Sequence, residues 1–250
     1  SFQIFVTQDP DGLIQTPVDV SDCDDTADGD DTNGFINNFI TTLSSKDAEI
    51  LNNVAFANIA LYTVSYHRSA TDATNDANAI DKVNPYTNET ANMQTIYVRV
   101  EHNDNPINCV AFTNFNLIVH PLPVYAATGP NPDIVDLKQC DDDTDGFSDF
   151  NLTEANILIS ADHLNETFVY YPTLADAQGD SNPIANPIAF TNRTTPTDIV
   201  WARAITVNGC YRIAQVNLIV STTGIPNTFA RTFNTCDDFL PTDGVTGAND

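Results

Sequence analysis

The segment Cys210–Val220, CYRIAQVNLIV, has a counterpart earlier in the chain, Cys109–Val119, CVAFTNFNLIV. Each copy begins with a cysteine and ends on Leu-Ile-Val, and apolar residues largely alternate with polar residues between them. Alternation with a period of two is typical of a β-strand that buries one face. In the earlier copy Phe112 and Phe115 lie three positions apart, which predicts a β-bulge in the strand.

Acidic stretches precede these strands and repeat along the chain. They are CDDTADGDDTNGF from Cys23, CDDDTDGF from Cys140 and CDDFLPTDG from Cys236, with starts spaced by about 100 residues. Between the acidic stretch and the strand, SYHRSATDA corresponds to VYYPTLADA, and IYVRVEH corresponds to VWARAIT, in the same order. The chain therefore contains two whole modules and parts of two more.

The repeat predicts the domain organisation. We expect a closing strand of a preceding repeat with a linker at 1–20, repeats at 21–124 and 138–222, linkers at 125–137 and 223–235, and the start of a following repeat at 236–250. Short connectors that contain proline favour a semi-rigid string of domains.

Short strands separated by turn signals, at about 100 residues per module, are typical of immunoglobulin-like sandwiches. Helical signals are brief: Ser69 with Asp72, and Thr173 with Asp176, form matched capping boxes that can start one turn each. We predict an all-β fold of tandem immunoglobulin-like Greek-key β-sandwich domains, arranged as beads on a string.

The chain has five cysteines, an odd number. Pairing within each module, Cys23 with Cys109 and Cys140 with Cys210, would leave Cys236 for a partner beyond Asp250. The alternative is a set of buried free thiols. Disulfides of this kind indicate an oxidising compartment.

The acidic run of the second module has the spacing of a calcium loop. Alternate carboxylates can converge on one ion, and a glycine permits the sharp turn. The candidate ligands are Asp141, Asp143, Asp145 and Asp149 in this module, and Asp24, Asp25, Asp31 and Asn33 in the first. The alternative is an acidic turn in which the aspartates accept local hydrogen bonds.

The formal charge of −25 disfavours binding to nucleic acid or to anionic lipid, since both need clustered cations. No apolar run is long enough to cross a membrane. The four histidines fit no zinc or protease motif, and the chain has no nucleophile elbow or phosphate loop. We therefore expect a protein that is not an enzyme.

Two pairs of side chains on strand faces are candidates for a recognition surface. Tyr97 with Arg99, and Trp201 with Arg203, are two positions apart and can form cation–π stacks. The alternative is a ladder of side chains that covers one sheet face.

The ordered set CDDDTDGFSDFNL, SYHRSATDA, NPYTNET and IYVRVEH resembles the tandem repeats of very large surface proteins from Bacteroidetes. The resemblance implies that the chain is part of an exported flavobacterial adhesin, associated with gliding and delivered by the type IX secretion system. In that phylum Asp25-Thr26-Ala27 also fits a signal for O-glycosylation, which would place a glycan on Thr26.

Together these features favour a non-catalytic extracellular repeat segment of a surface adhesin, stalk or filament, locked by disulfides and stabilised by calcium. Its partners would be neighbouring repeats, surface polysaccharide, other cells or like subunits. The alternative is a spacer or carbohydrate-binding part of a secreted polysaccharide-degrading enzyme. A third arrangement is a fibre in which neighbouring subunits exchange strands.

Overall fold

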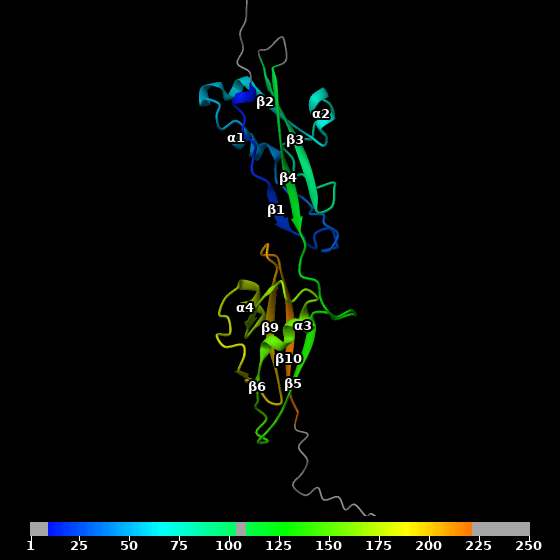
Figure 1. Ribbon diagram of the computed structural model, residues 1–250, viewed down its shortest axis with the longest axis vertical. Coiled ribbons are helices and arrows are strands. Elements are labelled where there is room, and N and C mark those ends of the chain that lie inside the picture. Colours follow the sequence, from blue (N-terminus) through cyan, green and yellow to red (C-terminus); the bar gives the residue numbers. More distant parts are fainter. Residues whose placement is uncertain (1–9, 104–108, 222–250) are drawn as a thin grey trace, which may run out of the picture.

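The computed structural model describes residues 10–103 and 109–221, which form two domains stacked end to end (Figure 1). The predicted closing strand at the start of the chain and the predicted opening of a following repeat at Cys236 lie outside these residues.

The first domain is built on a four-stranded sheet in the order β1-β4-β3-β2. Strand β1 runs parallel to β4, and the other neighbours are antiparallel. The strands are β1 (Val20–Cys23), β2 (Tyr62–His67), β3 (Met93–His102) and β4 (Val110–His120).

The second domain repeats this sheet in the order β5-β10-β9-β7, again with the first strand parallel to the last. Its strands are β5 (Ile134–Cys140), β7 (Thr167–Tyr171), β9 (Thr197–Ile205) and β10 (Tyr211–Ser221). The sequence pattern that occurs twice therefore forms the same sheet in both domains.

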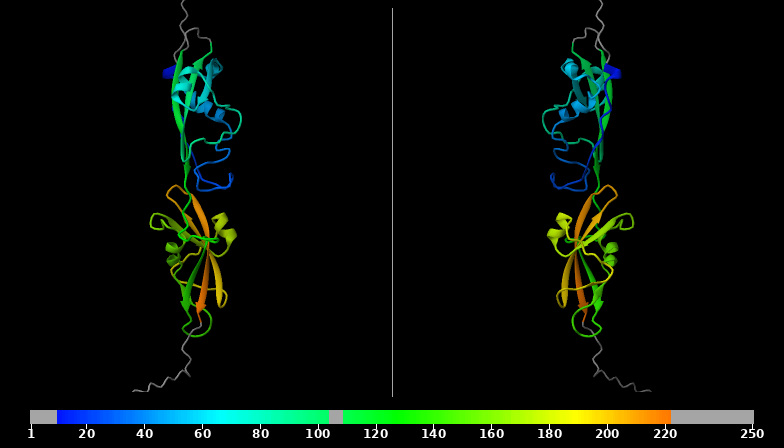
Figure 2. Two further views of the ribbon diagram at one scale, coloured as in Figure 1. Left: turned by 90° about the vertical axis from the view of Figure 1, so that its right-hand side faces the viewer. Right: turned by 90° about the vertical axis from the view of Figure 1, so that its left-hand side faces the viewer.

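Short elements complete each domain beside its sheet (Figure 2). In the first domain they are η1 (Pro10–Gly12), η2 (Leu43–Lys46), α1 (Asp47–Ile50), η3 (Phe56–Leu61) and α2 (Ala70–Asn75). In the second they are β6 (Asp149–Phe150), η4 (Leu152–Ala155), α3 (Asn156–Ile159), α4 (Leu174–Gly179) and β8 (Phe190–Thr191).

Each domain has its own hydrophobic core. Tyr66 and Phe115 are among the largest buried side chains of the first core, and Phe150 and Tyr170 among those of the second. The second layer of each sandwich is short, with β6 paired to β8 in one domain and a single bridge in the other. The predicted all-β fold of tandem immunoglobulin-like sandwich domains is confirmed.

The long hairpin arms are regular, so the predicted β-bulge is wrong. Strand β4 pairs with β3 without a break in register from Met93–Ile118 to Glu101–Val110. Phe115 is buried, whereas Phe112 points outward and is 45% exposed. The apolar spacing of three thus reflects an aromatic side chain on the outer face, where the Arg99 guanidinium lies 5.9 Å from its ring centroid.

Candidate functional site

A disulfide joins the two domains. Cys23, at the end of β1, is bonded to Cys210, which directly precedes β10 in the second domain. The two Cα atoms are 5.5 Å apart across a sequence separation of 187 residues. The bond therefore holds the lower end of the first sheet to the tip of the β9–β10 hairpin, which points toward the first domain in Figure 1.

The predicted pairings within modules, Cys23–Cys109 and Cys140–Cys210, are wrong. Cys23 lies opposite His120, at the far end of β4 from Cys109. Strands rise about 3.3 Å per residue, so the length of β4 separates these positions by about 35 Å, far beyond the reach of a disulfide. Cys140 faces the end of β10 in the same way and is an exposed thiol among the described residues.

An ion pair lies beside the disulfide. Arg212 follows Cys210 by two positions, and its guanidinium is 2.7 Å from the carboxylate of Asp31 in the acidic loop of the first domain. Both side chains are largely buried. Burial works against the charge of Arg212, but the Asp31 carboxylate outweighs it and raises the pKa of this guanidinium above its ordinary value.

The connecting segment strengthens the same junction. Arg212 Nε donates to the carbonyl oxygen of Pro123 (2.7 Å), and its guanidinium lies 5.1 Å from the ring centroid of Tyr125. The Tyr125 hydroxyl donates to the Ile213 carbonyl oxygen (3.2 Å). One arginine thus ties together the first domain, the connector and the second domain.

A cavity of about 490 Å³ opens at the junction, between the acidic loop and the hairpin. Asp22, Asp25, Leu122 and Tyr211 are among its lining residues. Thr26, the predicted O-glycosylation position, also lines the cavity and is exposed. Its modification stays a prediction.

The acidic loops are organised by their own hydrogen bonds. The Asp24 carboxylate accepts from the Gly34 amide (2.8 Å), and the Asp141 carboxylate accepts from the Gly146 amide (2.9 Å). Asp143 and Asp145 also accept from amides two residues ahead. This is the local bonding that an acidic turn makes.

Two buried asparagines, which the sequence analysis did not identify, hold these loops in place. Asn192 accepts from the Ser148 amide (2.7 Å) and donates to the carbonyl oxygens of Gly146 and Thr194. Asn88 makes the equivalent three bonds in the first domain. Their identical place in the two modules, each before a residue and a threonine, is the signal that could have found them.

Glycine is required at the first loop. Gly34 has a φ of +76°, and a Cβ there would lie 2.7 Å from the Asn92 amide nitrogen. Both the left-handed conformation and the close approach exclude a larger side chain.

The structure brings together three of the predicted metal ligands. Oxygen atoms of Asp141, Asp143 and Asp145 lie within 4.8 Å of one another, the one such acidic group in residues 10–103 and 109–221. Asp149 lies outside this group and accepts a hydrogen bond from the Thr191 hydroxyl. In the first loop Asp31 faces Arg212, and the Asn33 side chain bonds to Asp28 and to the Phe35 amide.

The two arginines of the predicted cation–π pairs contact side chains other than Tyr97 and Trp201. The Arg203 guanidinium lies 3.5 Å from the ring centroid of Tyr211 and faces Asp180 (3.7 Å), and Arg99 is buried near Asp76. These arginines fasten a short helix to the sheet, whereas Tyr97 and Trp201 are partly exposed. A recognition role for this face stays a prediction.

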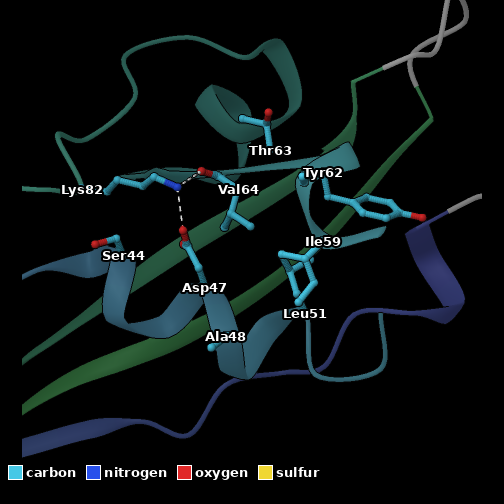
Figure 3. Close-up of a pocket in the computed structure, with 10 residues that line it drawn as sticks. Ser44, Asp47, Ala48, Leu51, Ile59, Tyr62, Thr63, Val64 and Lys82 are labelled. Atoms are coloured by element: carbon cyan, nitrogen blue, oxygen red, sulfur yellow. Dashed lines mark hydrogen bonds and ion pairs between the residues drawn. The ribbon is translucent and has the colours of Figure 1, made fainter. Parts of the chain in front are cut away.

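A second cavity, of about 480 Å³, lies in the first domain between α1, η3 and β2 (Figure 3). Apolar side chains line most of it. At one edge the Lys82 ammonium donates to the Asp47 carboxylate (2.7 Å) and to the Val64 carbonyl oxygen (2.9 Å). The charged groups of this cavity therefore satisfy each other.

The fold and the junction define a class of protein: tandem all-β repeat domains linked by a disulfide from one domain to the next. A model of the Flavobacterium inter-domain disulphide bond domain matches residues 19–123 and 136–225. The chain belongs to this family and carries two copies of its domain.

Solved structures similar to this chain include protocadherin ectodomains. Protocadherin gamma B7 domains 1–4 match over 65% of this chain and 39% of that chain (14% identity, TM-score 0.26). Human mucin-like protocadherin domains 1–2 match over 65% of this chain and 85% of that chain (11% identity, TM-score 0.24). The chain thus spans about two fifths of the gamma B7 structure. A comparison with curated proteins found no match.

No helix in the described part of the chain is long and apolar enough to span a bilayer.

Proposed function

We propose that this chain is a non-catalytic extracellular segment of a bacterial surface adhesin, stalk or filament, in which the disulfide between domains sets a fixed angle between neighbouring repeats. The observation that carries the proposal is the Cys23–Cys210 bond together with the Asp31–Arg212 ion pair. A bond within each domain would stabilise single beads, whereas a bond between domains stiffens the array.

Export and surface attachment are part of this proposal. A disulfide is typical of an oxidising compartment, and a strongly acidic surface resists non-specific association. The gliding and type IX secretion roles come from the resemblance of the repeats to flavobacterial surface proteins. The alternative remains a spacer or carbohydrate-binding part of a secreted polysaccharide-degrading enzyme.

Small-angle scattering of the 250-residue chain tests the proposal. The oxidised protein should behave as one elongated body with a fixed distance between domain centres. The Cys23→Ser/Cys210→Ser variant should show a broader distribution of that distance, with each domain still folded by circular dichroism. Equal rigidity with and without the bond would contradict the proposal, and the Cys140→Ser variant is the control that should change nothing.

Calcium stabilisation is a separate proposal, for the Asp141–Asp143–Asp145 group. Three convergent carboxylates suit a hard cation. Millimolar calcium should raise the melting temperature and a chelator should lower it. Asp143→Ala should remove this response, whereas Asp133→Ala, before β5, should keep it. A melting temperature that calcium leaves unchanged would reject the ion and favour a plain acidic turn.

A further inference from the structure

The end of the second domain repeats the arrangement by which the first domain receives its neighbour. Cys23 lies opposite His120, and the amide after the cysteine donates to the His120 carbonyl oxygen (2.9 Å). Cys140 lies opposite Ser221, and the amide after it donates to the Ser221 carbonyl oxygen (3.1 Å). The chain therefore leaves both domains at the same point beside the acidic loop.

At this end of the second domain the matching positions are more exposed than in the first, within the part of the chain that the structure describes. Cys140 is exposed, whereas its counterpart Cys23 is partly buried. Asp141 is partly exposed, whereas its counterpart Asp24 is only 5% exposed. A cavity of about 360 Å³ opens beside Cys140, and Phe147 at its rim is 42% exposed. In the first domain the corresponding cavity is closed on one side by the hairpin of the second domain.

The acidic partner of the Asp31–Arg212 ion pair also has an equivalent in the second domain. When the loops are aligned on their glycines, Gly34 and Gly146, Asp143 takes the place of Asp31. Asp31 receives Arg212, which stands two positions after the hairpin cysteine. The hairpin of the first domain has Ala111 at that position, so the two hairpins of this chain offer different chemistry to a loop.

The inter-domain disulphide for which the family is named implies that the end of the second domain, defined by Cys140, Asp143 and Phe147, docks the hairpin of a following repeat. We propose that Asp143 selects a repeat with a basic residue two positions after its cysteine. This inference rests on the proposed function and names the partner and the selecting residue. The occupant is a further repeat of this same kind, since a third acidic opening stands at Cys236.

The covalent step is a simple oxidation. The Cys140 thiol and the hairpin thiol each lose one proton and one electron as the sulfur–sulfur bond forms. A small-molecule or protein disulfide takes up both electrons and both protons and becomes two thiols.

A three-repeat chain tests the proposal. Residues 121–250 are placed directly after Ser221, so that the new connection copies the one after His120. Redox equilibration with glutathione, in a chelator to remove calcium, measures the effective concentration of Cys140 and the added hairpin cysteine. Two substitutions are compared: Asp143→Asn in the original second repeat, and Arg212→Ala in the added copy only. Each should lower this effective concentration about fivefold, and the double variant should show no larger decrease than either single variant. Asp136→Asn is the matched control.

The outcomes are distinct. If Cys140 stays a thiol while Cys23–Cys210 forms, the docking inference fails and the proposed function stands. If the Cys140 bond forms but Asp143→Asn has no effect or adds independently to Arg212→Ala, the selecting role of Asp143 fails. Loss of the Cys23–Cys210 bond in the unmodified chain would instead count against the proposed function.

Discussion

At the scale of single residues, the acidic loops depend on one buried side chain each. Asn192 fills three hydrogen-bonding positions at once and is only 2% exposed. Its removal would take away the bonds that it supplies to one partly buried amide and two partly buried carbonyl oxygens. Since such groups are costly when unpaired, the asparagine is more important for the loop than any one exposed aspartate.

Asn192→Ala should therefore reduce the free energy of unfolding of the second domain by about 2–3 kcal/mol. Urea denaturation followed by circular dichroism measures this loss. Asn217→Ala, which removes an exposed bond to Asp136 and a bond from the Gln215 side chain, should change it by less than about 0.5 kcal/mol. Similar effects of the two substitutions would show that the loop is not held by Asn192.

At the scale of elements, the helices α2 and α4 are each defined at the start by a capping box in the sequence and at the end by an arginine from the sheet. The predicted capping boxes are confirmed: the Ser69 hydroxyl accepts from the Asp72 amide (3.0 Å) and the Thr173 hydroxyl from the Asp176 amide (3.1 Å). At the other end Arg203, on β9, points to the Ala177 carbonyl oxygen of α4. A positive charge near a helix C-terminus stabilises it.

Arg203→Met should loosen α4, because it removes the charge, the Tyr211 stack and the bond to the helix end together. We expect a loss of about 1–2 kcal/mol and faster amide exchange over Leu174–Gly179. Lys138→Met, on an exposed position of β5, is the control. Unchanged exchange in α4 would mean that the capping box alone holds the helix.

At the scale of the whole molecule, the disulfide and the ion pair have the same effect: both favour the state in which the hairpin of the second domain is docked on the first domain. The Asp31–Arg212 pair holds the hairpin against the acidic loop beside the disulfide. It should therefore favour formation of the bond, because a docked hairpin holds Cys210 near Cys23.

Asp31→Asn should make the Cys23–Cys210 bond easier to reduce, by about fivefold in effective concentration at low salt. Equilibration with glutathione followed by thiol trapping measures this shift. The difference from the unmodified chain should shrink at high salt, since screening weakens the pair. An equally stable bond in the Asp31→Asn variant would mean that the covalent link alone sets the junction.

The sequence by itself determined what depends on near neighbours: the repeated modules, the period-two strands, the capped helices and the acidic turns. It could not determine which cysteine meets which, because repeat spacing does not say at which end of a strand a residue lies. Only the tertiary structure decided this. The parallel pairing of β1 with β4 carries Cys23 to the end of the domain opposite Cys109, where the nearest cysteine belongs to the next domain. The outward direction of Phe112 and the burial of Arg99 were decided in the same way, by packing across the sheet.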